Sequence, residues 1–161
     1  MDVAFLRRET QVTGLAYKFL IKEPLITVLP TGHRLAAHKA IQPQELAREI
    51  FIGPARVAPV LRSVINNYAK KVGITLKPAY ESENLSAAMS LVASTGGVTL
   101  APVCVKNMLT SSVVARPLRS EATTIDLMMG YNKSSTSALL KRFLSRADAL
   151  VSNVHKQFSS K

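Results

Sequence analysis

Residues 51–59 read FIGPARVAP, and this stretch indicates how the chain is built. Phe51-Ile52-Gly53 is short and apolar, as expected for a strand inside a covered sheet, and Pro54 to Pro59 has the composition of a loop. The residues that follow repeat apolar side chains with the period of a helix. The pattern therefore predicts a strand that leads through a short corner directly into a helix.

The predicted helix turns one apolar stripe toward a core and ends at Gly73. The stripe consists of Leu61, Val64, Ile65, Tyr68, Ala69 and Val72. A second unit follows, with a strand over 76–80, capping side chains in Ser82-Glu83-Asn84 and a helix that ends at Gly96-Gly97. A further strand covers 98–101. Strands separated by helices predict an α/β fold with a largely parallel sheet covered by helices.

The flanking sequence adds strands and helices on both sides of this region. Before it we expect strands over 2–6, 16–21 and 25–29, a turn at Lys22-Glu23-Pro24 and one helical turn that begins at Pro43. After it we expect a short helix over 103–109, strands over 113–117 and 125–131, and a long helix over 135–158.

Composition excludes several classes of protein. The chain has 161 residues, of which 47% are hydrophobic and 19% are charged, so it can bury a core and is not disordered. This length supports one compact domain or two small lobes. The single cysteine, Cys104, rules out a disulfide scaffold and fits a reducing compartment.

Neither a secretory signal nor a membrane span is expected. In the first residues the basic side chains follow a short apolar run, whereas in a secretory signal they precede a longer one. The longest apolar region, 15–30, is interrupted by Lys18, Lys22, Glu23 and Pro24, whereas a bilayer span needs about 20 apolar residues. We therefore expect no membrane partner and a cytoplasmic location.

The net charge is +11, from 21 Lys and Arg against 10 Asp and Glu. Such a charge favours polyanions, because neutralised phosphates release counterions. However, the basic residues are scattered, and no helix-turn-helix, Cys/His finger or RNA-recognition strand is found. A solvated basic surface is therefore favoured over a nucleic-acid site.

No set of residues forms a recognisable catalytic or metal-binding pattern. His33 and His38 lack neighbouring ligands and are expected at the surface, and Cys104 has no histidine near it in sequence. The glycines at 94–97 come after a helix and before a strand, the reverse of a phosphate loop, and predict a helix C-cap. We therefore expect no enzyme, no metal and no cofactor.

The strand-to-helix corners are the best candidates for a binding site. In open parallel sheets ligands bind where strand ends meet helix starts, because free amides and the positive end of the helix dipole lie there. The Arg56 guanidinium could donate two hydrogen bonds to a ligand carboxylate, although Arg56 could equally well be an ordinary solvent-exposed arginine in a loop. The loop Ser82-Glu83-Asn84-Leu85 occupies the equivalent corner of the next unit and could form another wall of the same crevice.

The order of several motifs resembles the effector-binding domain of LysR-type transcriptional regulators. The motifs are Asp2-Val3-Ala4-Phe5-Leu6-Arg7, Glu23-Pro24-Leu25, Val28-Leu29-Pro30, Gly32-His33-Arg34-Leu35-Ala36, Leu91-Val92-Ala93, Gly97-Val98-Thr99-Leu100-Ala101-Pro102 and Arg116-Pro117-Leu118. The resemblance implies two α/β lobes like those of type 2 periplasmic binding proteins, with a small effector between them. It also implies an amino-terminal winged helix-turn-helix, so DNA would be bound only through a domain not present here.

The resemblance further implies that the chain starts midway through the first lobe. Residues 1–28 would be later strands of a partial first lobe, 29–123 a complete second lobe, and 124–161 the return strand and terminal helix of the first lobe. The stripe of that helix, 140–158, would then lack its normal partners. Exposed apolar side chains favour association, so we expect a dimer, a larger oligomer or a poorly ordered first lobe.

Effector contacts carried over by position fall mainly on the corner after residue 54. They are Ala55, Arg56, Pro59, Val60 and Leu61, with Ile21 and Met129 near the cleft between the lobes. Aromatic-acid responders often have a cationic or amide group where this chain has Ile21 and Val60, which argues against a benzoate- or muconate-like effector. Arg7 and Arg56 remain the candidates for holding an anionic ligand.

The sequence thus predicts the effector-sensing domain of a LysR-type regulator, which binds a small, anionic ligand. Two other functions stay open. A solute-binding protein for transport shares the two-lobe architecture, and a non-specific polyanion binder would use the net charge of +11.

Overall fold

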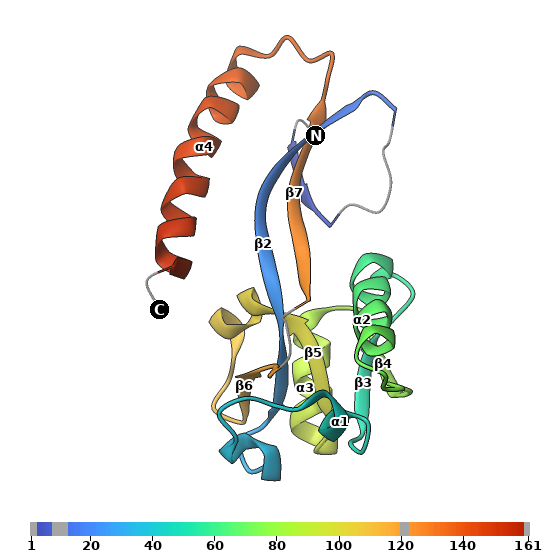
Figure 1. The fold of residues 1–161 in the computed structure, drawn as a ribbon. Helices are drawn as coiled ribbons and strands as arrows, with labels where there is room; N and C mark the ends of the chain where they lie inside the picture. The colour runs from blue at the N-terminus through green and yellow to red at the C-terminus, as the bar shows by residue number, and fades with distance from the viewer. Residues whose placement is uncertain (1–2, 8–12, 120–122, 160–161) are drawn as a thin grey trace. The chain divides into compact units, whose positions relative to one another are not determined.

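The computed structural model describes residues 3–7, 13–119 and 123–159, with side chains described as far as Val151 except at positions 148 and 150. The chain forms two compact units (Figure 1). Unit 1 consists of residues 1–22 and 126–161, and unit 2 of residues 23–125. The lobe limits expected from sequence, at 28/29 and 123/124, stay a prediction.

Unit 2 alternates strands and helices. In chain order it contains the later part of β2 (Leu15–Pro30), η1 (Arg34–Ala37), α1 (Pro43–Leu46), β3 (Phe51–Pro54), α2 (Pro59–Lys71), β4 (Pro78–Ser82), α3 (Leu85–Thr95), β5 (Val98–Pro102), η2 (Val103–Met108) and β6 (Val113–Pro117). The two helix stops predicted at glycine are confirmed, because Gly73 and Gly96 have φ of 70° and 74°, where glycine is favoured.

The sheet of unit 2 is mixed, so the expectation of a largely parallel sheet was wrong. β3 pairs in parallel with β4 and with β5, whereas β2 pairs antiparallel with β5 and with β6. Parallel neighbours need a crossover connection, and α2 and α3 supply one only between β3, β4 and β5. β2 is joined to the sheet by other segments and runs opposite to β5, whereas β6, which is antiparallel to β2, runs in the same direction as β5.

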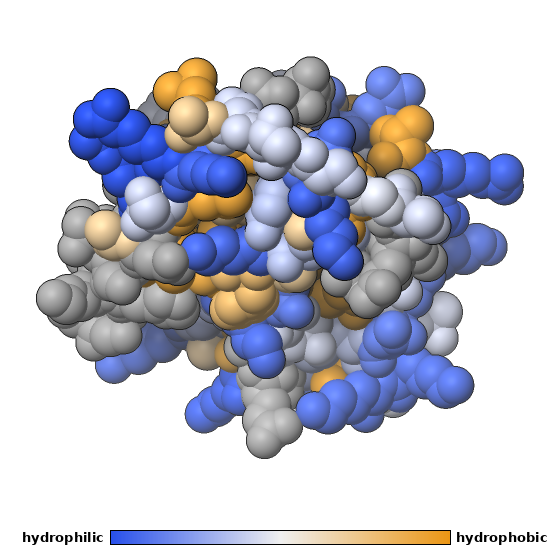
Figure 2. Space-filling model, turned by 90° about the horizontal axis from the view of Figure 1, so that it is seen from above, coloured by the Kyte–Doolittle hydropathy of each residue, from blue (hydrophilic) through white to orange (hydrophobic). Residues whose placement is uncertain are grey.

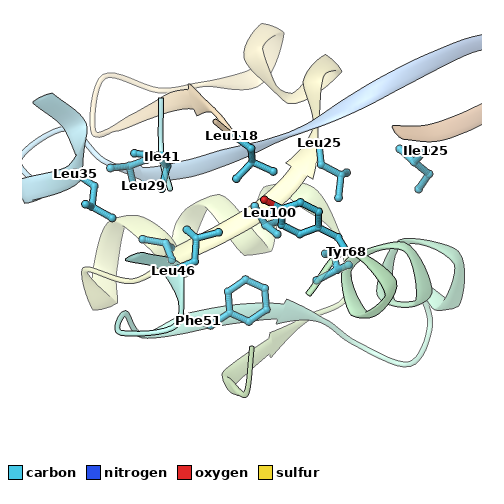
Figure 3. Packing of buried hydrophobic residues seen from close by; sticks show 12 residues of the cluster. Leu25, Leu29, Leu35, Ile41, Leu46, Phe51, Tyr68, Leu100, Leu118 and Ile125 are labelled. Atoms are coloured by element: carbon cyan, nitrogen blue, oxygen red, sulfur yellow. The ribbon is translucent and has the colours of Figure 1, made fainter. Parts of the chain in front are cut away.

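Helices cover both faces of this sheet, as the sequence predicted. On one face Tyr68 of α2 packs with a cluster that includes Leu25, Leu29 and Leu100 (Figure 3). Ile65 of the same helix belongs to this cluster. On the other face α3 packs against alternate residues of the same strands. This second cluster comprises Ile26, Val28, Ile52, Met89, Val92, Ala101, Val105 and Val113. The alternation along β2 places successive side chains in opposite layers.

β2 is one continuous strand, so the turn expected at Lys22-Glu23-Pro24 is wrong. A proline within a strand is tolerated where it removes no ladder hydrogen bond. The pairings of β2 with β5 and with β6 start at Leu25 and Ile26, after Pro24. Glu23 is buried within the strand, although its type suggested a turn.

Unit 1 contains β1 (Val3–Leu6), the first part of β2, most of β7 (Thr124–Asn132) and α4 (Ala138–Ser159). β1 pairs antiparallel with β7, and β7 lies next to β2. Leu20, Met129 and Ala147 form its buried core. None of the helices in the described ranges is long and apolar enough to cross a membrane.

Several large apolar side chains of unit 1 remain exposed. Phe5 is 62% exposed, Leu139 76% and Phe143 37%. Phe5 and Phe143 also line an apolar hollow of about 160 Å³ together with Ile21 and Val151. Figure 2 shows one face of the molecule, on which hydrophobic areas lie between strongly hydrophilic side chains.

His33 is not the surface residue that the sequence suggested. Its side chain is 10% exposed, and its Nε2 lies 3.1 Å from Glu49 Oε2. Its Nδ1 accepts a hydrogen bond from the Leu35 N–H, and Arg34 also contacts the Glu49 carboxylate. The residue thus joins η1 to the segment after α1, a contact that sequence spacing did not indicate. His38 is exposed, as expected, and lies 3.4 Å from Glu45.

Candidate functional site

A small cavity lies within unit 2 where strand ends meet helix starts. Its volume is about 80 Å³. It is lined by Pro54, Ala58, Leu61, Ser82, Glu83, Asn84, Leu85, Ala88, Thr99 and Leu100. These residues come from the ends of β3 and β4, the starts of α2 and α3, and β5. This is the position at which open parallel sheets hold ligands.

The two corners of the cavity are tied together by the backbone. The Ala55 N–H donates to the Ser82 carbonyl at 2.8 Å, which joins the end of β3 to the end of β4. Gly53 allows the close approach, because a Cβ there would lie 2.7 Å from Pro78 Cγ. The Ala58 N–H then donates to the Ala55 carbonyl at 3.1 Å and closes the turn before α2.

The two helices present their amino-terminal ends to the cavity in different ways. α2 begins at Pro59, and its N-cap residue, Ala58, has no side chain that could cap the first turn. In α3 the Asn84 Oδ1 accepts from the Ala87 N–H at 2.9 Å. The remaining first-turn amides and the helix dipole make both ends weakly positive.

Ser82, Thr99 and Glu83 supply polar side chains to the lining. Ser82 is 7% exposed, and its hydroxyl makes no hydrogen bond with the residues the structure describes. Thr99 Oγ1 donates to the Ile52 carbonyl at 2.7 Å and is therefore occupied. Glu83 is exposed. The rest of the lining is apolar or held in caps.

The structure brings together only some of the site residues expected in this unit. Leu61 and all four residues of the expected loop, 82–85, line the cavity. Ala55 forms the hydrogen-bonded corner beside the cavity. Val60, in the first turn of α2, packs against the core cluster that contains Ile65 and Tyr68. Arg56 and Pro59 are exposed and lie outside the lining.

The three site residues expected in unit 1 occupy different environments. Ile21 lines the apolar hollow of that unit. Met129 is fully buried in the unit 1 core. Arg7 follows β1 and is half-buried.

Sequence reasoning did not identify the contribution of β5. Thr99 and Leu100 line the cavity because β5 is the neighbour of β3, and this order of strands is not visible in the sequence. Ala58 and Ala88 were also missed, since small residues beside a cavity carry no chemical signal. Among the described residues, no three His, Cys, Asp or Glu side chains are grouped as metal ligands would be.

Comparison with known proteins gives one consistent result. A family model described as the LysR substrate binding domain matches residues 1–150. The Hca operon transcriptional activator HcaR of Escherichia coli (strain K12) is 29% identical over 149 residues, which are 89% of this chain and 49% of HcaR. The chain spans about half the length of the curated relatives that it matches.

Solved structures share the fold. HinK, a LysR family transcriptional regulator from Pseudomonas aeruginosa, matches with a TM-score of 0.80 at 20% identity over 93% of this chain and 53% of HinK. The regulatory domain of CcmR from Synechocystis PCC6803, solved in complex with 2-PG, also has a TM-score of 0.80, at 16% identity. That match covers 94% of this chain and 74% of the CcmR domain.

Proposed function

The chain belongs to the LysR substrate binding domain family, as its motifs predicted, and we propose that it is the effector-sensing part of a DNA-binding transcription regulator. The observation that carries this proposal is the unit 2 cavity, which combines two helix starts with the unpaired hydroxyl of the buried Ser82. A small polar ligand could satisfy that hydroxyl and the amides beside it.

The proposed mechanism is a shift between two arrangements of the regulator. An effector changes an equilibrium only by the difference in its affinity for the two states. We infer that the lobes, residues 1–28 with 124–161 and residues 29–123, hold the effector differently in those states. DNA would be contacted by a part of the regulator outside this chain, and the coupling between effector and DNA would be reciprocal.

A ligand screen with two matched variants tests the sensing role. Thermal unfolding of the wild-type chain would be followed with a panel of small organic acids, amines and amino acids. We expect at least one compound to raise the melting temperature, Ser82→Ala to reduce that shift, and Arg56→Ala, which lies outside the lining, to leave it unchanged. Equal shifts in wild type and Ser82→Ala would reject the site.

Solute capture and catalysis are the alternatives to a regulatory function. The curated relatives that the chain matches are transcriptional activators or regulators, which favours regulation over solute capture and over catalysis. We accordingly propose that the protein acts in the cytoplasm, where it can reach the chromosome, and cell fractionation would check this.

The net charge of +11 makes polyanion binding worth a separate measurement. If the basic surface is only solvated, a duplex DNA should bind weakly and without sequence preference. Tight binding that falls steeply with salt would instead identify a polyanion-binding protein. Fluorescence anisotropy at two salt concentrations distinguishes these outcomes.

A further inference from the structure

Glu83 is the charged side chain in the lining of the unit 2 cavity. The arginine on neighbouring α2, Arg62, pairs with Glu81 instead, with Nη1 3.1 Å from Oε1. Among the residues the structure describes, no lysine or arginine forms an ion pair with Glu83. The exposed Glu83 carboxylate therefore adds a negative charge to the cavity that no described lysine or arginine neutralises.

Ser82 provides a second and independent polar group at the same place. The residue is 7% exposed and lines the cavity, yet its hydroxyl has no hydrogen-bond partner among the described residues. Unlike the Thr27 hydroxyl, the Ser82 hydroxyl is not sealed from solvent, so it is available to bond to a ligand group that enters the cavity. A hydroxyl oxygen next to a carboxylate is a suitable pair of acceptors for a cationic nitrogen.

The start of α3, which follows Glu83 in the chain, favours a negative ligand group instead. The Asn84 side chain occupies the Ala87 N–H, and the amides of Leu85 and Ser86 belong to the first turn, which has no helical acceptors. These amides favour a negative group. A ligand that carries only a carboxylate would meet the like charge of Glu83, whereas one with both charges could satisfy both features.

We propose, on the premise of the function proposed above, that the effector held at this cavity is zwitterionic, with an ammonium group at Glu83 and Ser82 and a carboxylate toward the start of α3. An α-amino acid is the simplest compound of this class. The volume of about 80 Å³ admits a small polar head, with the rest of the ligand outside. Glu83 then selects against simple carboxylates, and Arg56, which lies outside the lining, takes no part in this contact.

Three probes of similar size and different charge test this assignment. They are alanine, ethylamine and propionate, titrated into the ¹⁵N-labelled chain while the backbone amides of residues 82–87 are followed by NMR. In the wild type we expect alanine and ethylamine to shift these amides. Propionate should bind with an affinity at least about tenfold lower than that of ethylamine, as one charge-assisted hydrogen bond allows.

Two charge-neutral variants complete the experiment. Glu83→Gln is expected to lower the affinity for ethylamine by about tenfold and to raise the affinity for propionate. Asp126→Asn removes the same charge from an exposed carboxylate of β7, outside the lining, and should leave the ratio of the two affinities unchanged. This control separates a local contact from the general field of the protein.

The possible failures point to different errors. If propionate binds the wild type as well as ethylamine does, or if the two variants act alike, the ligand class is wrong and the cavity remains an effector site. If no probe shifts the amides of residues 82–87 in any of the three proteins, the cavity binds none of these ligands, and the proposed function loses its site together with this inference.

Discussion

Thr27 is fully buried in β2, and its hydroxyl has no hydrogen-bond partner among the described side chains. The residue lies between Leu25 and Leu29 on the strand face that packs against the α2 layer. We expect Thr27→Val to raise the free energy of unfolding by about 1 kcal/mol, because it removes an unsatisfied polar atom at nearly constant volume. Urea unfolding measures the change.

Thr99→Val is the matched control for this prediction. It makes the same chemical change in a buried strand residue whose hydroxyl donates to the Ile52 carbonyl at 2.7 Å. Its loss should lower the free energy of unfolding by about 1 kcal/mol. The same sign for both variants would show that the Thr27 hydroxyl is satisfied in solution, for instance by a water molecule.

Gly97 has a role that its neighbour Gly96 does not share. A Cβ at position 97 would lie 2.7 Å from the Ile50 carbonyl oxygen, which is backbone and cannot turn aside. We expect Gly97→Ala to destabilise the chain by about 2 kcal/mol, in the range for overpacked sites. Gly32→Ala should be close to neutral, because nothing lies within 4 Å of a Cβ there. Melting temperatures that fall equally in both variants would contradict this.

At the scale of elements, the Asn84 cap can be tested separately from the cavity beside it. Its Oδ1 accepts from the Ala87 N–H at 2.9 Å and satisfies one of the first amides of α3. Asn84→Ala should cost about 1 kcal/mol of stability, whereas Asn84→Ser keeps a capping oxygen and should cost less. Equal losses in the two variants, measured by chemical unfolding, would mean that the cap contributes little.

Local sequence patterns predicted most helices and strands correctly, but they did not indicate contacts between residues that are distant in sequence. The predicted stripe of α2 contains all the buried residues of that helix, since periodicity reflects the layer that the helix covers. The continuity of β2 through Pro24 depends on where its partners begin, and the antiparallel pairing with β5 depends on topology. For the same reason Leu61 and Ser82 were found in the site, but Thr99 of β5 was not.

At the scale of the whole molecule, the exposed apolar residues of unit 1 predict self-association. Phe5 and Phe143 are 62% and 37% exposed and border one apolar hollow. We expect sedimentation velocity to show a dimer or larger species at micromolar concentration, and Phe143→Ser to shift it toward monomer. Tyr80→Ser, which changes a 46% exposed side chain of unit 2, should have no such effect. A monodisperse monomer for the wild type would reject the prediction.

The hydrogen bond from the Ala55 N–H to the Ser82 carbonyl has a kinetic consequence. It fixes two walls of the cavity to each other through the chain's own backbone, so an incoming molecule meets a surface that is already assembled. Little loop entropy is then lost when the complex forms. Compounds that differ in affinity for this pocket should therefore associate at similar rates and differ mainly in how long they stay bound.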